Sequence, residues 1–179
     1  MKKIIFILFL AAVTDVSAQN SDCLIDMKGI GRLKIGMSQE EIEKIVKQKF
    51  FLKNALDTAV SWQDSASANY KNGKVYLSFQ RQYTADKVYF MYLIGIRTSS
   101  TLCKTVRAIG IGDDKSAILA AYKQDKKIIK PEYNDKGYPI KNTHRISIEA
   151  DKLERRIVFH LRNKKVVTIE VSIIFNDEE

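Results

Sequence analysis

The sequence predicts an α+β protein made of two tandem repeats, each a short helical segment followed by a three- or four-stranded antiparallel sheet. Three observations support this prediction: two similar helix starts, an alternating apolar pattern after each of them, and the same order of these features in both halves. About 75 residues make only a small core, so the halves are expected to pack together or to join their sheets. The predicted parts are a signal peptide at 1–18, an extended segment at 19–29, a first repeat at 30–98 and a second repeat at 99–179.

The first helix is expected to begin at Ser38. Ser38 and Glu41 have the spacing of a capping box, in which the side chain of each accepts a hydrogen bond from the backbone N–H of the other. Gly36 fits the sharp turn before the helix, because glycine adopts positive φ without strain. Apolar residues then recur every three or four positions, which places them on one helical face that must be buried: Ile42, Ile45, Val46 and Phe50.

After this helix, residues 64–68 are expected to form a loop or a weak edge strand, and two clearer strands follow. Asn72-Gly73 is a strong signal for a type I′ turn, and the residues after it alternate between apolar and polar. The apolar positions of the next strand are expected on one side, and together the segments indicate an antiparallel meander. These apolar positions are Val75, Leu77 and Phe79, followed by Val88, Phe90, Tyr92, Ile94 and Ile96.

The second half repeats this order. Asp114 occupies the position of Ser38 at an offset of 76 residues, and it is expected to cap the second helix. The apolar alternation of the last strand matches that of 88–96 at an offset of 79 residues, through Val167, Ile169, Val171, Ile173 and Phe175. Helix cap, helix face and strand faces therefore recur in one order.

The turn and helix start at 35–42, and more weakly those at 111–118, resemble the motif of the β-lactamase-inhibitor-protein-like fold. The same motif is seen in small bacterial envelope lipoproteins of the SmpA/OmlA type. Inhibitors of this kind are tandem repeats of a helical segment and an antiparallel sheet. The resemblance implies that an open sheet surface binds a partner protein.

The first residues have the order of a secretory signal peptide. Lys2 and Lys3 precede an apolar run at 4–13, and a small-residue site ends at Ala18. The run is about half of the ~20 residues that span a bilayer, so a retained membrane anchor is the weaker alternative and no integral membrane segment is expected after cleavage. The sequence therefore predicts an exported protein, periplasmic or secreted.

Two cysteines, Cys23 and Cys103, follow the predicted cleavage site. In an oxidising compartment they are expected to form a disulfide. Two separate buried thiols are the alternative.

A protein partner is the first functional expectation. The last strand of the first half is apolar on its second face too, whereas the matching positions of the second half are polar. Aromatic and methionine side chains are favoured at interfaces, so this face is the candidate partner-binding surface. Burial of the same residues beneath the second half is the alternative. The candidate residues are Tyr76, Tyr89, Met91 and Leu93.

An anionic envelope component, lipid or glycan, is the alternative ligand. The chain has a formal net charge of +9, and basic residues concentrate in its second half. Solubility is the simpler interpretation of this charge, and no aromatic-interleaved basic motif points to nucleic acid. The candidate basic patch consists of Lys126, Lys127, Lys130, Arg155 and Arg156.

No sequence motif indicates an enzyme, a metal site or a cofactor. His144 and His160 are the two histidines, and neither has a partner at a recognised metal spacing. His160 is expected to face solvent, opposite the apolar side of its strand. Gly110 and Gly112 fit a turn, because the full dinucleotide-binding signature is missing. A non-enzymatic interaction module is therefore predicted, while a hydrolase with a site assembled from scattered residues stays open.

Overall fold

The computed structural model describes residues 23–53, 62–71, 73–83, 89–150 and 154–174. The predicted signal peptide at 1–18 lies outside these residues. Strand makes up 57% of the structure and helix 13%, in two helices. No helix among the described residues has the length and apolar character needed to cross a membrane.

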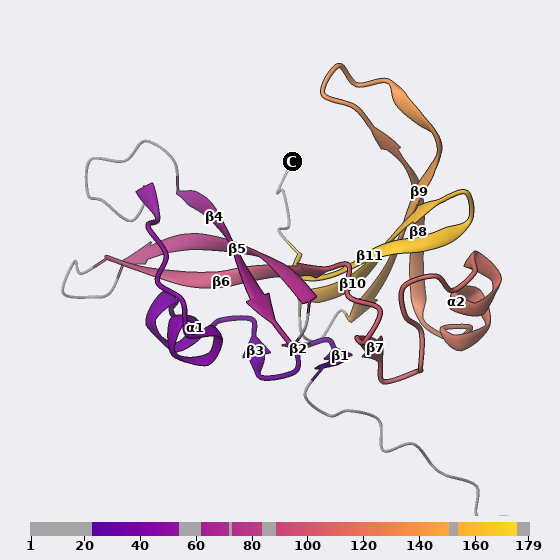
Figure 1. Cartoon of the computed structure of the whole chain (residues 1–179). Coiled ribbons are helices and arrows are strands. Elements are labelled where there is room, and N and C mark those ends of the chain that lie inside the picture. Colours follow the sequence, from indigo (N-terminus) through magenta and orange to yellow (C-terminus); the bar gives the residue numbers. More distant parts are fainter. Residues whose placement is uncertain (1–22, 54–61, 72, 84–88, 151–153, 175–179) are drawn as a thin grey trace, which may run out of the picture.

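Most strands belong to one antiparallel sheet of seven, in the order β4-β5-β6-β11-β10-β9-β8 (Figure 1). Strands from the two halves of the chain meet at its centre, where β6 pairs with β11 from Thr98 opposite Ile169 to Gly95 opposite Ser172. The bounds of the strands are β4 (Gln63–Tyr70), β5 (Gly73–Tyr83), β6 (Tyr89–Thr98), β8 (Lys126–Tyr133), β9 (Pro139–Ala150), β10 (Arg155–Arg162) and β11 (Lys165–Ile173).

A second sheet contains four short strands in the order β3-β2-β1-β7. Strands β1 and β7 pair in parallel, which brings residues near the start of the chain beside residues from its middle. The bounds of these strands are β1 (Leu24–Asp26), β2 (Gly29–Ile30), β3 (Leu33–Lys34) and β7 (Lys104–Thr105).

The predicted fold class is wrong. We expected two α+β repeats, each with a sheet of its own behind its helix, and the chain instead forms one long shared sheet and one small sheet. Each set of strands alone would leave an edge with unpaired backbone groups at the centre of the molecule. Pairing β6 with β11 removes that edge and makes the apolar face continuous.

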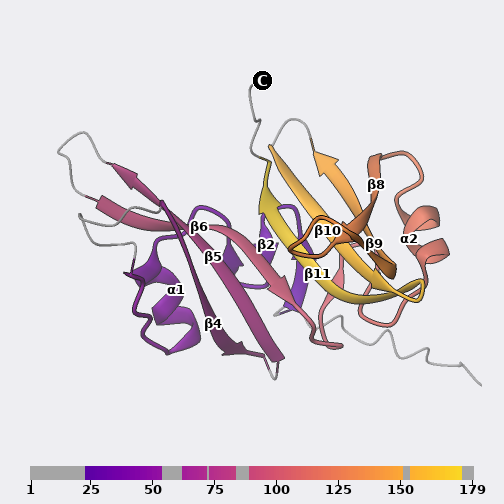
Figure 2. The ribbon, with the colours of Figure 1, turned by 90° about the horizontal axis from the view of Figure 1, so that it is seen from above.

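The core lies between one face of the long sheet and a layer made of the small sheet and the two helices, α1 (Gln39–Val46) and α2 (Lys115–Ala121) (Figure 1). Ile42 of α1 and Ile118 of α2 are fully buried. The ring of Tyr122 packs at a tilt against that of Phe159 of β10, with 5.7 Å between the centroids. Neither α1 nor α2 lies over the opposite face of the long sheet, as the view from above shows (Figure 2).

The capping box of α1 is confirmed. The Ser38 N–H donates to Glu41 Oε2 at 2.8 Å, and the Glu41 N–H donates to Ser38 Oγ at 3.4 Å. The helix ends at Val46 and Lys47 has a φ of +55°, so Phe50 lies beyond the helix, although its ring still contacts Phe79 in the core. Asp114 is the N-cap residue of α2, as predicted, but its side chain makes no capping hydrogen bond.

Candidate binding site

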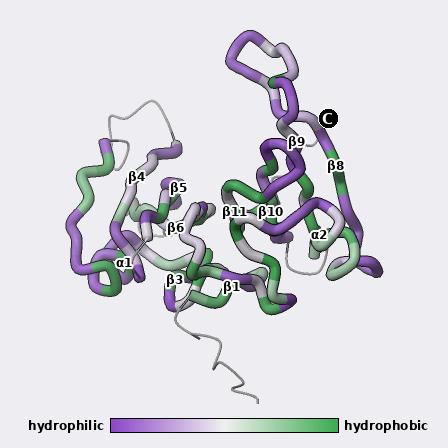
Figure 3. The backbone as a smooth tube through the Cα atoms, turned by 45° about the vertical axis from the view of Figure 1, so that its right-hand side comes forward, coloured by the Kyte–Doolittle hydropathy of each residue, from purple (hydrophilic) through white to green (hydrophobic). Residues whose placement is uncertain are grey.

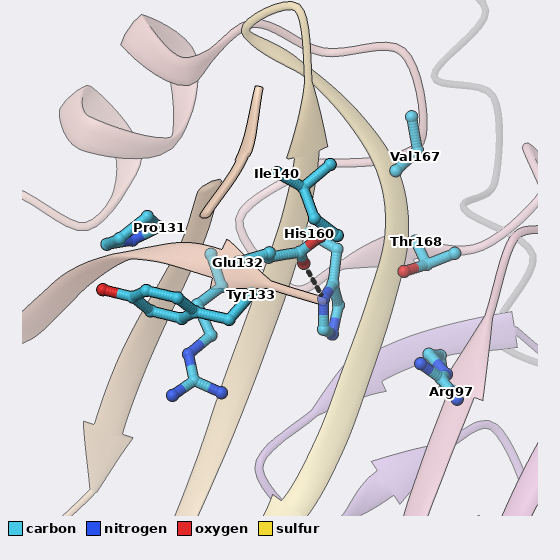
Figure 4. A pocket seen from close by; sticks show the side chains of 9 residues that line it. Arg97, Pro131, Glu132, Tyr133, Ile140, His160, Val167 and Thr168 are labelled. Atoms are coloured by element: carbon cyan, nitrogen blue, oxygen red, sulfur yellow. Dashed lines mark hydrogen bonds and ion pairs between the residues drawn. The ribbon is translucent and has the colours of Figure 1, made fainter. Parts of the chain in front are cut away.

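A hollow of about 440 Å³ lies on the open face of the long sheet, beneath the end of the β8–β9 hairpin (Figure 4). This hairpin rises on the side opposite the helices (Figure 1), and its end is largely hydrophilic (Figure 3). The hairpin contributes Pro131, Glu132, Tyr133 and Ile140 to the lining, and the sheet contributes Arg97, Arg145, His160, Val167 and Thr168.

An irregularity in both strands of the hairpin places it over the sheet. Pro131 pairs with His144, but the next pair is Tyr133 with Pro139, so Glu132 faces the segment 140–143. Proline supplies no N–H to the strand ladder, and such bulges bend a strand and redirect its side chains. Asn142 within the segment has a φ of +61°, which asparagine tolerates better than most residues.

A histidine between two carboxylates forms the floor of the hollow. His160 Nδ1 lies 2.5 Å from Glu132 Oε1 (Figure 4). His160 Nε2 lies 3.6 Å from Glu170 Oε2. The three residues come from β10, β8 and β11, and the His160 side chain is only 18% exposed.

The two carboxylates set the charge of this centre. Burial of His160 disfavours its charged form, but the nearby carboxylates of Glu170 and Glu132 outweigh burial and raise its pKa. Burial alone would raise the pKa of Glu170, but His160 together with Arg97 and Ser172 lowers it. The two shifts have one cause, because each charged partner favours the charged form of the other.

Both ring nitrogens of His160 face glutamates, whereas a general base needs a ring nitrogen within hydrogen-bonding reach of a substrate proton. Among the described residues, no group of three His, Cys, Asp or Glu side chains is arranged to hold a metal ion.

The rim of the hollow is apolar and aromatic. Tyr133 is 57% exposed, and Ile140 and Val167 beside the same hollow are exposed as well. Arg145 on the sheet side is also exposed. Exposed tyrosine and arginine around apolar side chains is the composition of protein-binding surfaces.

The four predicted partner-binding residues do not form one surface. Tyr76 is exposed on the open face, between Lys74 at 5.3 Å and Arg97 at 5.7 Å from its ring centroid. Met91 and Leu93 are only 3% and 0% exposed, in the core. The side chain of Tyr89 lies outside what the structure describes.

A β-bulge explains the burial of Met91 and Leu93. Ser78 pairs with Gly95 but Phe79 pairs with Leu93, so Ile94 is an extra residue in β6. An extra residue moves every side chain before it to the other face of the sheet. Strict alternation along 88–96 therefore assigned the wrong face to the first part of this strand.

The five predicted basic residues are not a continuous free patch. Lys126 pairs with Glu149 at 2.9 Å, and Lys127 Nζ donates to the backbone carbonyls of Tyr122, Lys123 and Asp125. Arg156 Nε donates to Ser172 Oγ at 3.3 Å, while Arg155 is partly buried and Lys130 is exposed. Successive strand residues point to opposite faces, so Lys127 and Lys126 belong to different sides of the sheet.

The disulfide between Cys23 and Cys103 is confirmed. The two residues are buried, their Cα atoms are 4.8 Å apart, and they flank the parallel pair of β1 and β7. Among the described residues there is no free cysteine.

The interpretation of His160 as a solvent-facing residue is wrong. Part of its environment could have been predicted from the sequence, because the β10–β11 hairpin places Thr168 opposite His160 and Glu170 diagonally from it. The contact with Glu132 could not have been predicted, because Glu132 reaches His160 from β8 over the intervening strand β9. His144 is exposed, as expected of a lone polar residue.

Comparisons with known proteins assign no family. No family model matches the chain, and no curated protein matches it significantly. A solved structure of a DUF4309 family protein, YjgB from Bacillus subtilis, aligns over 83% of this chain and 86% of its own, with 10% identity and a TM-score of 0.42. A likeness of this degree supports no conclusion about function, and the resemblance to the β-lactamase-inhibitor-protein-like fold is not confirmed.

Proposed function

We propose that this chain is an exported, non-enzymatic module that binds a protein partner on the open face of the long sheet. The observation that carries the proposal is the exposed rim of Tyr133, Ile140 and Val167 around the hollow. Apolar side chains around a concave, partly polar floor are typical of a site that takes a side chain or loop of another protein.

Two features support export to a periplasmic or extracellular location. The N-terminal residues have the composition of a signal peptide. The disulfide between Cys23 and Cys103 fits an oxidising compartment.

The anionic-ligand alternative has weaker support. It required five free cations on one surface, and Lys126, Lys127 and Arg156 have partners within the protein. Binding driven by such cations would weaken steeply as salt rises, whereas binding to the apolar rim would not.

Site-specific photo-crosslinking tests the proposal. A photoreactive amino acid replaces Tyr133 in one variant and Val106 in the control, and cells of the source organism express each variant. Val106 is also exposed and apolar, but it follows β7 of the small sheet on the helix side. We expect a defined cross-linked protein from position 133 and none from 106. Identical products from both positions, or no protein product from 133, would contradict the proposal.

A further inference from the structure

The end of the β8–β9 hairpin, residues 132–140, is a unit with its own turn, which we call the strap. The Asn134 N–H donates to the Tyr138 carbonyl at 2.9 Å, and the Asn134 side chain accepts from the N–H groups of Lys136 and Tyr138 at 3.0 Å. Regular pairing stops at Pro131 in β8 and at His144 in β9, and it resumes only between Tyr133 and Pro139. The strap is therefore joined to the sheet through an irregular segment in both strands, which is where a hairpin bends most easily.

A charged contact fastens the strap to the sheet. Glu132 is the first residue of the strap, and its carboxylate reaches the ring of His160 on β10 at 2.5 Å (Figure 4). Tyr133 and Ile140 of the strap line the same hollow as Val167 of β11. The charged contact and the apolar side chains of the strap thus lie at one place on the sheet.

The charge of His160 decides how well this contact is made. An imidazolium presents one N–H to Glu132 and the other toward Glu170 at 3.6 Å, whereas a neutral ring has one N–H and leaves one carboxylate facing a lone pair. Among the residues that line the hollow, the other charged groups are two cations, Arg97 of β6 and Arg145 of β9. Further charged groups on the same face of the sheet are Lys130 opposite Arg145, Arg156 of β10, and Glu149 of β9, which pairs with Lys126 of β8.

We propose that the strap closes over the hollow when His160 is protonated and is released when His160 loses its proton. Control of access to the binding site by this movement rests on the function proposed above, but the movement itself is a property of the free protein. The raised pKa of His160 agrees with the direction, since a group whose pKa is raised by a contact strengthens that contact below its pKa. A tenfold difference between the ionisation constants of the closed and open forms is a tenfold change in the closing equilibrium.

NMR of the full chain with its disulfide intact measures this coupling. The two histidine rings and the backbone amides are followed from about pH 5 to about pH 9, and His144→Gln identifies the ring of His160. We expect the amides of residues 134–138 to shift with the midpoint of His160 and to exchange faster with solvent above it. Strap amides that do not titrate, or that follow His144, would overturn the inference.

Variants test whether the pH response of the strap depends on the contact between His160 and Glu132. In His160→Gln the pH-dependent shift of the strap should be lost, while His144→Gln should retain it in full. Glu132→Gln keeps the histidine and the volume of the side chain, and it should lower the pKa of His160 and uncouple the strap even if His160→Gln does not fold. Titration of the strap in Glu132→Gln with unchanged amplitude would refute the proposal.

This experiment and the cross-linking experiment can fail independently. Specific cross-links at position 133 with a strap that does not titrate would overturn the strap inference alone. A titrating strap without cross-links would leave the closing movement in place and contradict the proposed partner.

Discussion

The two helices of this protein begin with the same turn and then differ. Gly36 before α1 and Gly112 before α2 both have a φ of +93°, a backbone angle that favours glycine. The Gly36 N–H donates to the Leu93 carbonyl in β6 at 2.8 Å, and the Gly112 N–H donates to the Val166 carbonyl in β11 at 2.9 Å. Each turn is therefore attached to one of the two central strands of the long sheet.

After the turn, α1 is held by residues of its own segment. Ser38 and Glu41 complete the capping box. The buried carboxylate of Glu43 accepts hydrogen bonds from the Phe50 N–H at 2.8 Å and from Lys49 Nζ at 2.7 Å, so the residues after the helix fold back onto it.

Helix α2 is held by residues from elsewhere. Asp114 at its start pairs with Lys165 of β11 at 3.0 Å, and Lys127 of β8 donates to the Tyr122 carbonyl at its end at 2.6 Å. Arg107, before the helix, donates to the Ala121 carbonyl at 2.6 Å. The ends of α1 are thus stabilised by residues close to it in the sequence. The end of α2 is instead hydrogen-bonded to β8, the strand that continues into the strap.

Removing the disulfide should have the largest effect, because this bond links the two parts of the chain that carry these helices. Cys23 and Cys103 are separated by 80 residues, and a loop of that length stabilises a protein by about 4 to 5 kcal/mol on the chain-entropy model. We expect the double variant Cys23→Ala/Cys103→Ala to lose most of this free energy of unfolding in urea.

Two probes show whether the two parts then unfold together. Trp62, the only tryptophan, reports on the first part through its fluorescence, and circular dichroism reports on the whole sheet. Coincident transitions are expected, because β6 and β11 keep the sheet continuous. A double variant with the stability of the original protein would contradict this account of the bond.

Replacing Glu43 should have the next largest effect and should be specific to α1. Glu43→Ala leaves the Phe50 N–H without its acceptor in a partly buried place, which costs about 1 to 3 kcal/mol. The matched control is Glu40→Ala on the exposed face of the same helix, which should change stability little. Equal losses in both variants would show that Glu43 contributes no more than an ordinary surface glutamate.

The pH dependence of stability tests the same residue. Burial works to raise the pKa of Glu43, but the hydrogen bonds from Lys49, Phe50 and Gln39 outweigh it and lower the pKa below its ordinary value. A group with a lowered pKa contributes stability that is present above its unfolded pKa of about 4.5 and is lost as the pH falls through its folded pKa. We therefore expect the stability gap between the original protein and Glu43→Gln to narrow below about pH 4.5 in urea unfolding.

The sequence predicted what depends on short range and missed what depends on long range. The capping box at Ser38 and Glu41 depends on residues three positions apart, and it is present. The extra residue Ile94 in β6 cannot be recognised in the sequence, because its neighbours on both sides are apolar too. Met91 and Leu93 were therefore assigned to the wrong face. Faces of strands are predictable only up to the first bulge.

The candidate site shows the same limit more strongly. Tyr76 was named for a candidate surface whose exposure or burial the sequence left open, and its side chain is exposed. The contact of Glu132 with His160 requires an irregular hairpin that passes over a neighbouring strand, and no sequence spacing encodes it. The same holds for the joining of two sheets into one, which depends on the pairing of β6 with β11.

The smallest expected effect concerns the two N-caps and sharpens the difference between the helices. Ser38→Ala removes a capping hydrogen bond and should cost about 1 kcal/mol. Asp114→Ala removes an exposed ion pair with Lys165 but no capping bond, so we expect a loss of about half a kcal/mol or less.

Salt separates the two mechanisms. The pair of Asp114 and Lys165 is about half exposed on both sides, so its contribution should vanish in about 1 M salt, where charges are screened within a few ångströms. The cost of Ser38→Ala should persist, because a neutral hydroxyl makes that bond. Urea unfolding of both variants at low and high salt measures these losses of stability. If the loss in Ser38→Ala depended on salt and the loss in Asp114→Ala did not, our assignment of which helix is held by its own residues and which by its neighbours would be reversed.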